Sequence, residues 1–307
     1  MKQSAQRASR RPAHIPRKPE WLKVALGGGH TYAGVSELLH QQGLHTICAS
    51  GRCPNQGECW ANGTASFMIL GNICTRSCRF CATQTGVPLP PDLNEPTRLA
   101  HSIQRMNLRH VVITSVDRDD LPDGGAQHWA DVVEAIREAN PTTTVEVLLP
   151  DFLAKPGALE LVLQTRPELV AHNMETVERL SPQVRSRARY DYSLSVIERM
   201  ARAGLVPKSG LMLGIGEEKD EVMATMDDLR AVGCQVLTLG QYLQPRRENL
   251  NVVRYLTPEE FNELGDIARA KGFRYVESGP LVRSSFHAER ALLACGIMPK
   301  TLAHAPR

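Results

Sequence analysis

The sequence predicts an α/β fold: a partial (β/α)6 barrel of the TIM type with N-terminal and C-terminal extensions. From residue 67 onward, short apolar runs typical of buried strands alternate with amphipathic stretches, which indicates a parallel sheet with crossover helices. Polar residues or glycines directly follow at least four of these runs, as in ITSVDRDD and LMLGIGEE. Because several strand ends build the site of a barrel, whereas a doubly wound sheet uses one crevice, we favour the barrel.

Each element of the barrel is expected from its own hydrophobic pattern. The predicted strands are the apolar runs at residues 67–70, 110–116, 144–149, 168–173, 209–214 and 235–240. The predicted helices have apolar residues three and four positions apart, and they cover residues 97–106, 127–139, 157–165, 190–203 and 219–232. Beyond residue 257 we expect one more helix and a strand at FRYVES, residues 273–278. The glycine-rich stretch at residues 25–44 is expected to be poor in helix.

These elements divide the chain into four parts. Residues 1–20 form a basic tail that we expect to be disordered, because its first eighteen residues contain no acid. Residues 21–64 form the N-terminal extension, residues 65–256 the partial barrel, and residues 257–307 the C-terminal extension.

The composition indicates an ordinary globular protein, with 42% hydrophobic residues, 22% charged residues and a formal net charge of +3. No apolar run approaches the length of a membrane span, and no aromatic residue interleaves with the basic tail. We therefore expect a soluble, cytoplasmic protein with neither a nucleic acid nor a membrane as partner.

The most informative feature is the clustering of cysteines, since six of the eight fall between positions 48 and 81. In a chain long enough to bury a core, such clusters are more often metal ligands or catalytic groups than disulfides. Cys74, Cys78 and Cys81 have the spacing C-x3-C-x2-C without a fourth cysteine or histidine close by. Structural zinc normally takes four ligands, so this trio better suits a 4Fe–4S cluster with one iron open. Three unrelated cysteines, or a zinc site with a distant ligand, remain alternatives.

An earlier trio, Cys48, Cys53 and Cys59, also lacks an obvious fourth ligand. The residues between these cysteines are typical of an irregular loop that can wrap a second cluster: Gly51, Pro54, Asn55 and Gly57. Cys234 and Cys295 stand apart, and we expect each to be a small buried apolar residue.

The C-x3-C-x2-C loop, with Phe80 before its last cysteine, resembles the signature of radical S-adenosylmethionine (radical SAM) enzymes. Together with the earlier trio, the resemblance is to one family, lipoyl synthase, through CPN-x-GECW, GTA-x-FMILG and CTR-x-C-x-FC in that order. It continues in TSVDRDDLPDGGAQHWA, HNMETV, LMLGIGEE, QYLQP, RYLTPEEF and SGPLVRSSFHA, and so covers the chain from Lys18 to about Ala288. The combination of two trios with the RSS motif is highly specific, although no single element is.

The resemblance implies an activity and its cofactors. S-adenosylmethionine is expected to bind the open iron of one 4Fe–4S cluster, where one electron splits its sulfonium and yields a 5′-deoxyadenosyl radical. The enzyme is expected to insert two sulfur atoms, at carbons 6 and 8, into an octanoyl chain on a lysine of a lipoyl carrier domain or the glycine-cleavage H protein. A second 4Fe–4S cluster is the expected sulfur source. An electron donor such as flavodoxin or ferredoxin is the other expected partner.

The resemblance also implies roles for individual residues. Cys74, Cys78 and Cys81 are expected to hold the cluster that binds S-adenosylmethionine. The earlier trio is expected to hold the second cluster, with a serine of the RSS motif as fourth ligand. The family pattern selects Ser285 rather than Ser284. A hard alkoxide is a poorer match to cluster iron than a thiolate, so such a ligand can leave when sulfur is extracted. Without the resemblance, RSS reads as a polar turn or a helix cap.

Seven further residues are candidates for contact with the cofactor: Phe80, Asp117, Arg118, Asn173, Glu175, Arg185 and Gly214. Most follow predicted strands, an arginine can bind a carboxylate through two hydrogen bonds, and a glycine permits close approach of the backbone. Each charged candidate could equally form a structural salt bridge or a helix cap. We expect His172 and His287 to be structural.

Three positions depart from the family pattern. Phe286 stands where a tyrosine is usual, Asn249 where a histidine is usual, and Glu277 where a small residue is usual. Two alternative functions stay open: a radical SAM sulfur-inserting enzyme with another substrate, and a non-catalytic zinc- or cluster-binding module.

Overall fold

A curved, mostly parallel sheet organises the computed structural model, which describes residues 17–23, 30–51, 53–61 and 66–297. Residues 1–16 of the expected basic tail therefore lie outside the described residues. The strands of the main sheet are β1 (His45–Thr46), β2 (Ser66–Ile69), β5 (His110–Ser115), β6 (Thr144–Leu148), β7 (Leu169–Ala171), β8 (Pro207–Leu213), β9 (Val236–Gln241) and β10 (Tyr275–Gly279). They pair in the order β1-β2-β5-β6-β7-β8-β9-β10, and all pairs are parallel except β1 with β2.

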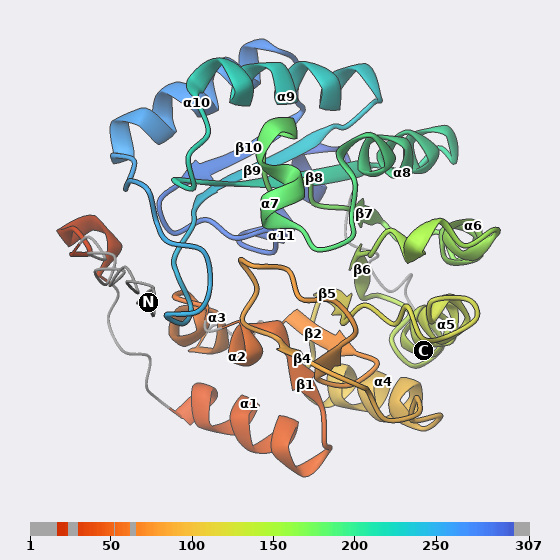
Figure 1. Ribbon diagram of the computed structural model, residues 1–307. Helices are drawn as coiled ribbons and strands as arrows, with labels where there is room; N and C mark the ends of the chain where they lie inside the picture. The colour runs from red at the N-terminus through yellow and green to blue at the C-terminus, as the bar shows by residue number, and fades with distance from the viewer. Residues whose placement is uncertain (1–16, 24–29, 52, 62–65, 298–307) are drawn as a thin grey trace, which may run out of the picture.

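A helix follows each of the six strands from β2 to β9, which confirms the predicted partial (β/α)6 barrel. In chain order these helices are α4 (Glu95–Arg105), α5 (Ala126–Ala139), α6 (Ala158–Gln164), α8 (Tyr190–Arg202), α9 (Lys219–Ala231) and α10 (Pro258–Ala270). Figure 1 shows them one after another around the outside of the sheet, with the ring open on the left, where α2 (Ile47–Ser50) and α3 (Gln56–Ala61) lie.

The remaining elements are short or lie outside this ring. They are the 3-10 turns η1 (Glu20–Leu22), η2 (Phe152–Ala154) and η3 (Glu178–Leu180), the small parallel pair β3 (Ile73–Cys74) and β4 (Gln84–Thr85), and the helices α1 (His30–Gln41), α7 (Ser181–Val184) and α11 (Ala288–Ala294). Among the described residues, no helix is both long enough and apolar enough to span a membrane.

The core lies between the sheet and the outer helices, as the hydrophobic pattern requires. Trp129, Val132 and Ile136 are three and four positions apart on α5, and all three are fully buried together with Ile113 of β5. At the amino ends of the strands, Ala291 and Leu292 of α11 pack with Leu169 and Val236, which are the first residues of β7 and β9.

Two expectations about the ends of the chain need correction or extension. The described part of the glycine-rich stretch is not poor in helix, because α1 runs for twelve residues until Gly43, at φ +60°, ends it. Buried Leu38 and Leu39 anchor this helix, and tertiary packing outweighs the weak local propensity.

The strand expected near residues 273–278 is β10, which pairs in parallel with β9 and extends the barrel sheet by one strand.

Candidate functional site

The later cysteine trio lies in the loop after β2, at the carboxyl end of the parallel strands. The N–H of Cys81 donates to the carbonyl of Cys78 (3.0 Å), so these two thiols share one tight turn. The Sγ of Cys74 accepts a hydrogen bond from the N–H of Arg76, and the Sγ of Cys81 accepts one from the N–H of Thr83, both at 3.4 Å. Backbone N–H groups that point at sulfur stabilise a thiolate, which is the form that binds iron.

Burial favours the protonated form of two of these thiols, Cys74 and Cys81, because it raises their pKa. Burial, reinforced by the carboxylate of Asp117, raises the pKa of Cys74 to about 12. Burial also raises the pKa of Cys81, although hydrogen bonds from Thr83 oppose the shift. The Cys81 thiol interacts electrostatically with both Cys74 and Cys78, which indicates that the three thiols lie close together. Iron binding must therefore displace protons.

Arg76, in the middle of the cysteine loop, anchors the loop to the ends of β5 and β6. Its side chain is 3% exposed and contacts three carboxylates, with shortest N–O distances of 3.2 Å to Asp117, 2.8 Å to Asp119 and 2.6 Å to Asp151. Burial opposes ionisation of Asp151, but the hydrogen bond and charge of Arg76 outweigh it and lower the pKa of that carboxyl. The sequence analysis did not predict this role of Arg76. The only indication in the sequence was that an arginine stands inside the cysteine loop, in the CTR segment.

Asn249 anchors the other end of the loop. Its side-chain amide donates to the carbonyl of Arg79 (3.1 Å) and to that of Cys81 (2.9 Å). The N–H of Arg79 in turn donates to the carbonyl of Val184. The residue that departs from the family pattern therefore supports the cysteine loop through both of its amide hydrogens.

A cavity of about 630 Å³ opens beside this loop at the carboxyl ends of the strands. Of the predicted site residues, it is lined by Cys74, Phe80, Cys81, Asp117, Asn173 and Glu175. Gly210 of β8 helps to keep it open, because a Cβ at that position would lie 2.6 Å from the Oγ1 of Thr238 and 3.1 Å from the Oδ1 of Asn173.

Asn173 and Glu175 both line this cavity, and Asn173 has an unsatisfied polar atom. The Oδ1 of Asn173 is buried and has no hydrogen-bond partner among the described residues, while its Nδ2 donates to the Oε1 of Glu175 (3.2 Å). Burial raises the pKa of Glu175 although the charge of Arg185 opposes the shift. An orphaned amide oxygen fits a ligand that donates hydrogen bonds, as the amino group and ribose hydroxyls of S-adenosylmethionine do.

The structure does not bring three other predicted cofactor residues to the lining of this cavity. Arg118 is buried and binds Asp120 through two hydrogen bonds of 2.9 and 2.8 Å. Gly214 makes room for the side chain of Gln241 and not for a ligand, because a Cβ there would lie 2.2 Å from the Nε2 of Gln241. Arg185 is also buried, and its guanidinium donates to the Oγ of Ser193 (2.8 Å).

His172 ends a buried hydrogen-bond chain that starts at Arg185. Since Arg185 donates to the Oγ of Ser193, that hydroxyl donates to the Nε2 of His172 (2.9 Å), and the Nδ1–H of His172 donates to the carbonyl of Leu149 (2.9 Å). Burial, and then the charge of Arg185, lower the pKa of His172 to about 4. The side chain is therefore a neutral packing element, in keeping with a structural role.

The earlier cysteine trio lies in the N-terminal segment, on two short helices and the turn between them. Cys48 is in α2, Cys59 is in α3, and the N–H of Cys53 donates to the carbonyl of Cys48 (3.0 Å). The irregular loop expected here is thus partly helical. The Nδ2 of Asn55 donates to the carbonyl of Leu281 (2.7 Å), which ties this segment to the chain just before the RSS motif.

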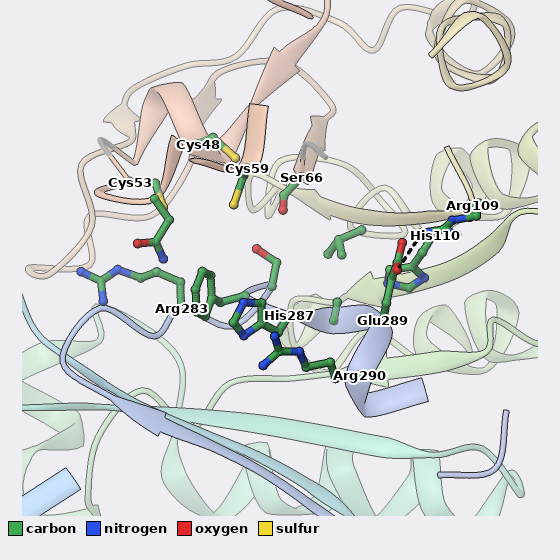
Figure 2. A pocket seen from close by; sticks show the side chains of 15 residues that line it. Cys48, Cys53, Cys59, Ser66, Arg109, His110, Arg283, His287, Glu289 and Arg290 are labelled. Atoms are coloured by element: carbon green, nitrogen blue, oxygen red, sulfur yellow. Dashed lines mark ion pairs between the residues drawn. The ribbon is translucent and has the colours of Figure 1, made fainter. Parts of the chain in front are cut away.

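A second cavity, of about 300 Å³, lies between the earlier trio and the RSS motif. In Figure 2, Cys48, Cys53 and Cys59 lie on one side of this cavity, and Arg283 and His287 lie on the other. Ser285 and Phe286 also line it. Ser284 lines the larger cavity instead, and Arg283 lines both.

The two other residues that depart from the family pattern are Phe286 and Glu277. Phe286 lines this second cavity, and Glu277 contacts His287, which also lines it. The carboxylate of Glu277 accepts hydrogen bonds from the hydroxyl of Tyr275 and from the Nδ1 of His287 (3.3 Å). Glu277 therefore positions His287, which has a left-handed backbone at φ +52° and begins α11.

The donor sets fit iron–sulfur clusters better than single metal ions. Among the described residues, no group of three histidine, cysteine, aspartate or glutamate side chains is arranged to hold one metal ion. In a 4Fe–4S cluster each thiolate binds a different iron, so the ligands are spread more widely. Burial lowers the pKa of Arg283, but the electrostatic interaction with Cys53 opposes the shift, so a half-buried guanidinium lies near this thiol. A cation there offsets the negative charge of thiolate ligands.

Comparison with known proteins first defines the class. The Radical SAM superfamily model matches residues 68–229, more than half of the chain, from β2 into α9. The crystal structure of Streptococcus suis SuiB bound to S-adenosylmethionine has a similar fold, with a TM-score of 0.53 over 70% of this chain and 51% of that chain, at 11% identity. The chain therefore has the fold of a radical SAM protein and belongs to that superfamily.

Within that class, the chain belongs to the lipoyl synthase family. It is 57% identical over 274 residues to the lipoyl synthase of Parabacteroides distasonis, which covers 89% of this chain and 98% of that protein. It is also 57% identical over 274 residues to the lipoyl synthase of Bacteroides thetaiotaomicron, with 89% and 97% covered.

Proposed function

We propose that this protein is a lipoyl synthase, which inserts two sulfur atoms at carbons 6 and 8 of an octanoyl chain attached to a lysine of a lipoyl carrier protein. One observation supports it most: the two cavities, each bordered by residues of one cysteine trio, adjoin at Arg283. An octanoyl chain that lies along this segment would reach a radical formed at one site and a sulfur source at the other. Kinship with lipoyl synthases over about nine-tenths of the chain supports the same activity.

When bound, two 4Fe–4S clusters and S-adenosylmethionine supply the electron, the hydrogen-abstracting radical and the sulfur. The residues of the chain hold and separate these groups. Cys74, Cys78 and Cys81 are the ligands that we assign to the cluster of the larger cavity. Asn173 and Glu175 are suited to accept hydrogen bonds from the cofactor.

The second cluster is assigned to the smaller cavity, with Cys48, Cys53, Cys59 and Ser285 as its ligands. Apolar side chains line part of the larger cavity, among them Ile47, Leu148 and Val282. They suit an alkyl chain and exclude water from the radical.

The partners follow from this chemistry. The substrate is an octanoylated lipoyl carrier domain or the glycine-cleavage H protein, and each cleavage of S-adenosylmethionine needs one electron from a donor such as flavodoxin or ferredoxin. We assign the protein to the cytoplasm, because six thiols that bind clusters must be kept reduced.

The activity is tested with anaerobic enzyme whose clusters have been rebuilt with isotopically heavy sulfide. With dithionite, S-adenosylmethionine and an octanoylated lipoyl-domain peptide, we expect lipoyl product with heavy sulfur at both positions. Without a repair system the amount of product should not exceed the amount of enzyme, because the sulfur source is consumed. Light sulfur from solution, or many turnovers without repair, would contradict the proposal.

The two serines of the RSS motif should differ in effect. Ser285→Ala is expected to retain cleavage of S-adenosylmethionine and to lower lipoyl formation by about tenfold or more, since loss of a metal-site residue commonly costs at least that much. Ser284→Ala is the matched control and should retain more lipoyl formation than Ser285→Ala, because Ser284 does not line the cavity assigned to the second cluster. The reverse pattern would make Ser284 the ligand. Product masses and 5′-deoxyadenosine are both read by mass spectrometry.

A further inference from the structure

Four exposed arginines surround the outer face of the later cysteine loop: Arg79, Arg187, Arg246 and Arg247. We call this set the basic rim. Arg79 belongs to the loop itself, and the turn that contains Arg246 and Arg247 is attached to the loop through Asn249.

Arg187 reaches the rim from the segment after α7. The preceding residue, Ser186, accepts a hydrogen bond from the N–H of Ser77 (3.2 Å), and its Oγ lies 3.6 Å from the Sγ of Cys78. The rim therefore combines three segments of the chain that meet at the cysteine loop.

The rim is positively charged, and few acidic side chains within the described residues pair with its arginines. Arg246 and Arg247 form no ion pair there, and Arg187 has only a long one of 3.8 Å to Asp119. Glu248 is the one acid of the same turn. Two arginines of the outer helix α8 do have close partners, since Arg199 pairs with Glu160 and Arg202 with Glu198 at 2.5 and 2.6 Å.

Cys78 connects this surface to the site. Cys74 and Cys81 line the 630 Å³ cavity, but Cys78 does not, and it is only half-buried. The Cys78 side of the loop therefore faces the rim, whereas the cavity side is left for the cofactor and the alkyl chain. A carrier that binds the rim would therefore approach the trio from its Cys78 side.

We propose that the basic rim is the docking surface for an acidic one-electron carrier protein. The inference rests on the proposed function, in which the donor loses one electron for each S-adenosylmethionine that is cleaved, so no further co-reactant is needed. Weak electron-transfer complexes have small interfaces, and charge complementarity speeds their formation more than it tightens them. The rim is positively charged, exposed to solvent and next to the cysteine loop, as such a complex requires.

The test compares a protein donor with a small reductant in the holoenzyme. In Arg246→Glu/Arg247→Glu, cleavage of S-adenosylmethionine driven by reduced flavodoxin at low salt should fall by about tenfold or more, because steering by charge changes association rates by that order. Cleavage driven by dithionite should stay unchanged. Added salt should lower the flavodoxin-driven rate of the unaltered enzyme. It should therefore reduce the difference in this rate between the unaltered enzyme and the rim variant.

The matched control reverses two exposed arginines at the opposite end of the barrel, Arg105→Glu/Arg202→Glu, and should retain the flavodoxin-driven rate. A rim variant no slower than this control would overturn the proposal, and so would an equal loss with dithionite, which would indicate damage to the loop. If the rim variant instead raised the KM for an octanoylated lipoyl domain with dithionite as reductant, the rim would dock the carrier. Failure of the proposed function is separate: it would show as cleavage without lipoyl product in the unaltered enzyme.

Discussion

Replacing Cys48, Cys53 and Cys59 together with alanine is expected to abolish lipoyl formation and to leave cleavage of S-adenosylmethionine intact. These thiols lie beside the 300 Å³ cavity, whereas Cys74 and Cys81 line a different one. The loss removes the assigned sulfur source but no ligand of the radical site. Both products, 5′-deoxyadenosine and the lipoyl peptide, are measured with dithionite as reductant.

The matched variant replaces Cys74, Cys78 and Cys81 with alanine and should lose cleavage and lipoyl formation together. Each triple variant should retain the iron of one cluster, and circular dichroism should show that each is folded. Normal cleavage in the second variant would reverse the assignment of the trios. Loss of all iron from either folded variant would contradict two independent sites.

Arg76→Met is expected to destabilise the protein by about 3–5 kcal/mol, because it leaves the buried carboxylate of Asp151 without its partner. Its guanidinium is the shared contact of Asp117, Asp119 and Asp151, and methionine keeps the length of the side chain but not the charge. The loop should then lose its attachment to β5 and β6. We expect a lower midpoint of urea unfolding, and an iron content after reconstitution that falls toward that of one cluster.

Arg199→Met is the control, because Arg199 also makes close contacts with a carboxylate, that of Glu160, but on the partly exposed surface of α8. Such a pair contributes about 1 kcal/mol or less. If Arg76→Met unfolds at the same urea concentration as Arg199→Met and binds its full iron, the role of Arg76 as an anchor is wrong.

Much of the fold could be predicted because its signals are local. Apolar runs and amphipathic stretches identified the six strand–helix units, and each of these patterns reports the burial of one element. The N-terminal helix α1 was not predicted because three glycines directly precede it, although Leu38 and Leu39 lie within it. Those two leucines form a helix only because there is a surface for them to pack against.

The sequence predicted only in part which candidate cofactor residues line the larger cavity. Asn173 and Glu175 face the larger cavity as expected, whereas Arg118 and Gly214 are occupied by contacts with Asp120 and Gln241. A position after a strand places a residue at the correct end of a barrel. It does not determine whether the side chain turns toward the cavity or toward a neighbouring loop.

By itself, the sequence determined the barrel class, the two cysteine trios and the likeness to one family, because spacing and period are properties of neighbouring residues. Only the tertiary structure decided that Arg76 meets Asp151, 75 positions away, and that Asn55 meets Leu281, 226 positions away. It also decided that Ser284 and Ser285 border different cavities. The reason is physical: such pairs meet only when the strands have closed into a curved sheet and the C-terminal segment has packed against the open side of the ring of helices.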